Sequence, residues 1–65
     1  MKNLTIINEI IANLEDEVFE RINEAETEMW LGDTARDRRN AKKRLAYNLN
    51  KNGLTIDEYI MWCAN

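Results

Sequence analysis

Apolar residues recur at spacings of three and four over residues 4–30, which is the longest regular pattern in the chain. They are Leu4, Ile7, Ile11, Leu14, Val18, Ile22, Ala25 and Met29. Because a helix turns by about 100° per residue, these side chains share one helical face. The opposite face carries mostly carboxylates, which stay hydrated there. The pattern predicts a single amphipathic helix over residues 4–30, about 40 Å long, with Asn3 as its N-cap.

A second helix is expected over residues 35–52, after a short connection at residues 31–34. Gly32 is expected to take the left-handed conformation that ends a helix, and Asp33 or Thr34 is expected to cap the next one. Such a short connection predicts that the two helices lie antiparallel. The apolar positions of the second helix are few and small, so the two backbones can approach closely. In this arrangement we expect ion pairs of Arg38 with Glu26 and Glu28, and of Lys42 with Glu24.

A third, short helix is expected over residues 56–64, after a stop at Asn52 and Gly53. Thr55 and Glu58 have the spacing of a capping box, and Leu54 and Tyr59 that of a hydrophobic staple. So short a helix needs tertiary packing, and we expect it against the amino-terminal half of the first helix. The predicted fold is all-α, with a long first helix and a basic second helix in an antiparallel hairpin, closed by a short C-terminal helix. Residues 1–65 are expected to form one domain.

The small size of the domain predicts self-association. A chain of 65 residues buries too little surface for a strong core of its own. One cysteine excludes an internal disulfide, and the absence of histidine removes the common zinc sites, so we expect a homodimer. The candidate contact is the amino-terminal aliphatic cluster, because one short helix packed against it could not cover all of its side chains. This cluster consists of Leu4, Ile6, Ile7, Ile10, Ile11 and Leu14.

The sequence also predicts a cytoplasmic protein without a membrane partner. Asn8 and Glu9 interrupt the apolar residues near the amino terminus, so a secretory signal is not expected. No apolar run approaches the roughly 18 residues of a membrane span. The lone thiol agrees with a reducing compartment.

Charge is divided unevenly along the chain. Residues 1–33 carry nine acids and two bases, whereas residues 34–52 carry seven bases and one acid. In one interpretation, an acidic helix and a basic helix offset each other within the fold; in the other, each face meets a partner. The candidate partner-binding residues lie on the outer side of the second helix and are called the basic face. The basic face consists of Arg36, Arg39, Asn40, Lys43, Arg44, Tyr47 and Lys51.

Catalytic chemistry has little support in the residue pattern. No histidine can activate Cys63, whose apolar surroundings should raise the pKa of the thiol, so we interpret it as a small buried hydrophobe. Carboxylate pairs such as Glu15 with Asp16, or Glu20 with Glu24, are expected to lie on a convex helical surface without a pocket. No motif for a metal, a phosphate or another cofactor is present. We therefore expect a protein that is not an enzyme and has no cofactor.

These exclusions leave binding to another protein as the expected function. A small regulator or inhibitor of the kind carried by bacterial mobile elements or phages would fit. The alternative is a nucleic-acid-binding protein that uses the basic face, since cations, an asparagine and a tyrosine can serve phosphate contact and base stacking. The net charge of −3 and the carboxylates of the first helix weigh against that alternative.

Overall fold

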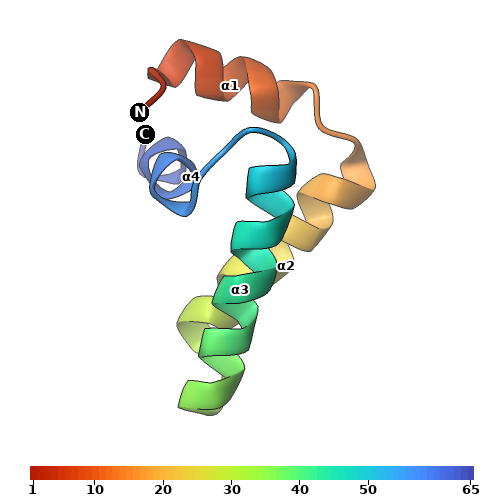
Figure 1. The fold of residues 1–65 in the computed structure, drawn as a ribbon, viewed down its shortest axis with the longest axis vertical. Helices are drawn as coiled ribbons and strands as arrows, with labels where there is room; N and C mark the ends of the chain where they lie inside the picture. Colours follow the sequence, from red (N-terminus) through yellow and green to blue (C-terminus); the bar gives the residue numbers. More distant parts are fainter.

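The computed structural model describes all 65 residues and contains four α-helices, where the sequence predicts three. In chain order they are α1 (Leu4–Ala12), α2 (Asp16–Leu31), α3 (Ala35–Lys51) and α4 (Ile56–Cys63). The all-α class and the antiparallel hairpin, formed by α2 and α3, are confirmed. α1 and α4 pack together at one end of this hairpin, and its other end extends beyond them (Figure 1).

The prediction of one helix over residues 4–30 is wrong, because the chain bends between α1 and α2. Asn13 ends α1, and its backbone N–H donates to the carbonyl oxygen of Glu9 at 3.2 Å. α2 then begins with Asp16 and Glu17, whose negative charges suit a helix amino terminus. A straight helix over these residues would be about 40 Å long. The whole molecule extends over only 35 Å along its longest axis.

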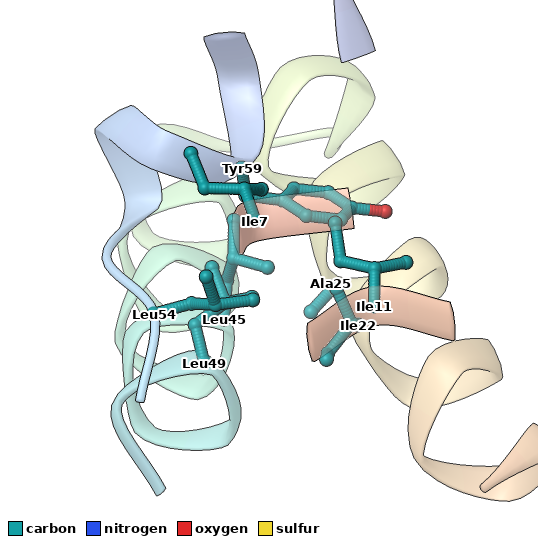
Figure 2. Close-up of a cluster of buried hydrophobic side chains, with 8 residues drawn as sticks. All are labelled: Ile7, Ile11, Ile22, Ala25, Leu45, Leu49, Leu54 and Tyr59. Carbon is teal, nitrogen blue, oxygen red and sulfur yellow. The ribbon is translucent and has the colours of Figure 1, made fainter. Parts of the chain in front are cut away.

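The bend allows both halves of the predicted apolar face to enter one core. Figure 2 shows the leucines of α3 and its following loop on one side of the cluster, and Ile11, Ile22 and Ala25 on the other. All four helices contribute, and most of these side chains are fully enclosed. The core consists of Ile7, Ile11, Ile22, Ala25, Leu45, Leu49, Leu54 and Tyr59.

The ends of α3 follow the predicted capping residues, but the end of α2 does not. Thr34 caps α3 by accepting a hydrogen bond from the Asp37 N–H at 3.0 Å. Gly53 has a φ of +82°, and the Leu54 N–H donates to the Leu49 carbonyl at 2.9 Å, which is a Schellman end. Gly32, in contrast, has a φ of −58°, so the expected left-handed conformation is wrong. A glycine is needed at this position for a different reason. A Cβ there would lie only 2.7 Å from the carbonyl oxygen of Glu28, so a larger residue would collide with the backbone.

The predicted capping box of α4 is present, and it is joined to the amino terminus of the chain. Thr55 and Glu58 exchange the two expected hydrogen bonds, at 2.9 and 3.2 Å. The Glu58 carboxylate also accepts a hydrogen bond from the backbone N–H of Lys2 at 2.7 Å. The two chain ends therefore lie close together beside α4 (Figure 1).

α4 packs on α1, as the sequence predicts. Trp62 is half-buried between the rings of Phe19 and Tyr59, with centroid distances of 6.3 and 5.9 Å. Its indole N–H donates to the Asn8 side chain at 3.2 Å. α4 is thus attached to both α1 and α2. No helix in the structure has the length and apolar character needed to cross a membrane.

Candidate protein-binding surface

The basic face lies entirely on α3, and all seven of its residues are exposed. α3 has this arrangement because its apolar residues, Ala41, Leu45 and Leu49, all turn toward α2 and the core. The remaining arc of the helix is therefore left to charged and polar side chains. Tyr47 lies within this arc with 65% of its surface exposed, so it does not contribute to the core.

Three residues of the basic face, Arg44, Tyr47 and Lys51, interact within the chain. Arg44 forms an ion pair with Glu28 of α2, and the Lys51 ammonium lies 5.6 Å from the centre of the Tyr47 ring. Arg36, Arg39 and Lys43 take part in none of the ion pairs of the structure, which otherwise join Lys2 to Glu58 and Arg21 to Glu17. Direct pairing between α2 and α3 therefore offsets little of the positive charge of α3.

The predicted ion pairs of Arg38 and Lys42 are wrong. Arg38 instead donates to the carbonyl oxygen of Gly32 at 2.7 Å, closing the turn between α2 and α3. Lys42 lies on the side of α3 that faces α4, whereas Glu24 lines the opposite side of the hairpin together with Arg21 and Arg44. Residues 42 and 44 differ by about 200° around a helix, which explains why Arg44, and not Lys42, reaches α2 on that side.

An open groove lies between α4 and the part of α2 and α3 that extends beyond it. The sequence did not reveal this groove. We call it the inner groove; it has a volume of about 560 Å³. Its apolar lining comes from three helices and consists of Met29, Trp30, Ala46, Ile56 and Ile60. A second hollow of about 410 Å³ shares Lys42, Ala46 and Ile56 with it and continues to Arg39 and Lys43. One edge of the basic face therefore borders the inner groove.

The amino-terminal aliphatic cluster is divided by the fold. Ile7 and Ile11 are buried in the core of the same chain, so they cannot meet a second chain while this fold is intact. Ile10 and Leu14 are half-buried and pack against that core. Leu4 and Ile6 keep 37% and 43% of their surface exposed, so they are the residues of the cluster most available for self-association. The homodimer remains a prediction of the sequence.

Cys63 is exposed, so the prediction that it is a buried hydrophobe is wrong. The predicted direction of its pKa is confirmed. Partial desolvation, together with the nearby carboxylate of Glu26, raises the pKa of the thiol. Burial likewise raises the pKa of the Tyr59 hydroxyl beside it. Both groups are therefore protonated and neutral near pH 7, and neither is poised as a nucleophile.

The acidic side chains do not gather into a metal site. The structure contains no group of three or more His, Cys, Asp or Glu side chains that could hold an ion. An acidic hollow near the turn includes Glu24, Glu28, Asp33 and Asp37, on the side of the hairpin away from the inner groove. The two sides of the hairpin thus differ in both charge and apolar character.

Comparison of the chain with protein-family models, with curated proteins and with solved structures finds no match.

Proposed function

We propose that this chain is a protein-interaction module that acts as a regulator or inhibitor by binding another protein. The observation that carries the proposal is the exposure of Arg36, Arg39 and Lys43 on one side of α3 without an ion pair inside the chain. The chain carries twelve acidic residues, yet it leaves these three cations unpaired. Such cations favour a partner with an acidic surface, because charge complementarity steers association and selects partners.

Capture from a nuclease-treated lysate of the encoding organism tests this proposal. The parent protein should retain a specific protein that the doubly reversed variant R39E/K43E loses. Exposed cations contribute little to folding, so circular dichroism should show that the variant stays helical. The matched control is R21E, which reverses an exposed cation on α2 that is paired with Glu17. A parent that retains no protein lost by R39E/K43E would contradict the proposal.

Nucleic-acid binding is the second candidate, and the exposed ring of Tyr47 favours it. Lys43 and Lys51 stand one turn before and one turn after Tyr47, so cations lie beside a ring that could stack on a base. Gel-shift experiments with generic DNA and RNA at two salt concentrations separate the candidates. Phosphate-driven binding must weaken steeply as salt rises, and Y47A should weaken it further.

A further inference from the structure

The inner groove lies where the fold leaves apolar side chains without cover. α1 and α4 pack at one end of the hairpin, and the rest of α2 and α3 extends past them (Figure 1). At this inner corner Trp30 keeps 59% of its surface exposed, and Met29, Ile56 and Ile60 are only half-buried. An exposed tryptophan among half-buried aliphatic side chains is typical of the anchor positions of protein interfaces.

The rim of the groove is positively charged on the α3 side. Lys42 lines both hollows, and Arg39 and Lys43 follow along the same helix. None of these three cations has an ion-pair partner, and Asp57 is the only acid among the lining residues. A complementary ligand therefore needs an apolar face with carboxylates beside it.

We propose that the inner groove binds an acidic amphipathic helix of the partner protein. This inference rests on the proposed function and specifies the segment that the module recognises. A helix is about 10 Å across with its side chains, and it presents apolar residues at i, i+3, i+4 and i+7 with acids along the flank. Its apolar face would cover Trp30 and Ile60, and its acidic flank would meet Lys42 and Lys43.

A second copy of this chain does not supply such a helix. The acidic helix α2 already directs Ile22 and Ala25 into its own core. α1 does the same with Ile7 and Ile11, so neither helix can offer its main apolar face to another copy without unfolding. The occupant is therefore a segment of a different protein.

Titration with synthetic peptides tests the inference, with amide and indole N–H chemical shifts of the labelled protein as the readout. The probe is a peptide of about 18 residues, which is roughly five helical turns, with leucines on one face and glutamates along one flank. The first control peptide has the same composition in scrambled order, and the second has lysine in place of every glutamate. The probe should shift the Trp30 indole and the amides of α4 near Ile60, and both controls should bind at least about tenfold more weakly.

Matched variants locate the binding. W30A and A46E should each weaken binding of the probe about tenfold or more, because they remove an anchor and fill the groove floor. L31S is the control: Leu31 is the neighbour of Trp30 and is 76% exposed, but it lines the acidic hollow on the other side of the hairpin. It should change the affinity by less than about twofold, as expected of a residue outside an interface. Unfolding curves check that each variant is folded. If A46E is unfolded, W30A alone tests the inference.

Three outcomes would overturn the inference without deciding the proposed function. The probe and its scrambled control could bind equally well, which would show that charge alone acts. The probe could fail to bind, while the capture experiment still yields a partner that depends on Arg39 and Lys43. Anionic phosphatidylserine vesicles could shift the Trp30 indole where the peptide does not, which would assign the groove to a lipid surface. A capture experiment in which the parent retains no protein that R39E/K43E loses would instead be a failure of the proposed function.

Discussion

Glu58 is the one charged side chain that the fold buries, with 2% of its surface exposed. Its carboxylate is satisfied from two directions, by the backbone N–H of Thr55 and by the backbone N–H of Lys2. The Lys2 ammonium adds a weaker contact at 3.8 Å. The hydrogen bond from Lys2 has the largest effect and, despite the opposing effect of burial, the pKa of Glu58 is lowered from its ordinary value of 4.5.

This lowered pKa predicts a loss of stability in acid. The unfolded chain takes up a proton at a higher pH than the folded chain, so the stabilisation is present at neutral pH and is lost as the pH falls through the folded pKa. The free energy of unfolding of the parent should therefore decline from about pH 5 downwards. E58Q should be less stable at pH 7, because its amide NH₂ would face the Lys2 N–H. Its free energy of unfolding should also decline less in acid, because glutamine has no carboxylate to take up a proton. Urea unfolding at several pH values measures both, and equal slopes for parent and variant would contradict the assignment.

Thr55 provides the other half of the same cap. T55A should lower the free energy of unfolding by about 1 kcal/mol, because the Glu58 N–H loses its acceptor. In a domain of this size that corresponds to roughly 4–8 °C in melting temperature. T27A is the control, since Thr27 is exposed within α2 and alanine is the better helix former. A T55A protein as stable as T27A would show that the cap contributes nothing.

At the scale of the helices, the bend after Asn13 is the largest departure from the sequence prediction. The apolar spacing continues through the bend without a break, so periodicity alone could not reveal it. The available signal was local: Asn13 is a common helix end, and Asp16 and Glu17 are typical of a first turn. Predictions that rest on such neighbouring residues were confirmed at Thr34, Gly53 and Thr55. The prediction at Gly32 failed because that turn depends on a close approach between backbones.

The start of α2 can be improved by a single substitution. Glu15 occupies the N-cap position, and its side chain makes no capping hydrogen bond. E15D should raise the free energy of unfolding by about 0.5–1 kcal/mol, because aspartate is among the preferred N-cap residues and its shorter side chain can accept from the first turn. The control E20D makes the same change on the exposed side of α2 and should be slightly destabilising, since aspartate is a poorer helix former. Thermal unfolding of the two variants side by side decides the matter, and a loss of stability in both would count against an N-cap at this position.

At the scale of the whole molecule, the candidate surfaces could be predicted only where they belong to one helix. The basic face was predicted because its residues follow one another around α3. The inner groove was not, since Trp30, Ala46 and Ile60 lie on three helices and come together only through the packing of α4. The bend likewise decides which isoleucines reach the core. The self-association surface predicted from periodicity therefore included Ile7 and Ile11, which are buried in the core of the same chain.

Self-association can now be tested with adjacent residues. I6D should weaken any association while leaving the chain folded, because Ile6 is 43% exposed. I7D should unfold the chain at every concentration, since Ile7 is fully buried within it. Sedimentation equilibrium and melting curves at several protein concentrations measure both effects. A parent that sediments as a monomer, with a melting temperature independent of concentration, would refute the predicted dimer.

The contact between Lys2 and Glu58 brings residues 56 positions apart into hydrogen-bonding distance and nearly closes the chain into a ring. We therefore expect the four helices to pack in the same way even if their order along the polypeptide is changed. A circular permutant, with the two ends joined by a short linker and new ends at the turn between α2 and α3, should keep all four helices in place. The pairing of α1 with α4 would become local in such a chain and that of α2 with α3 distant, so the permutant should fold by a different order of events to the same structure.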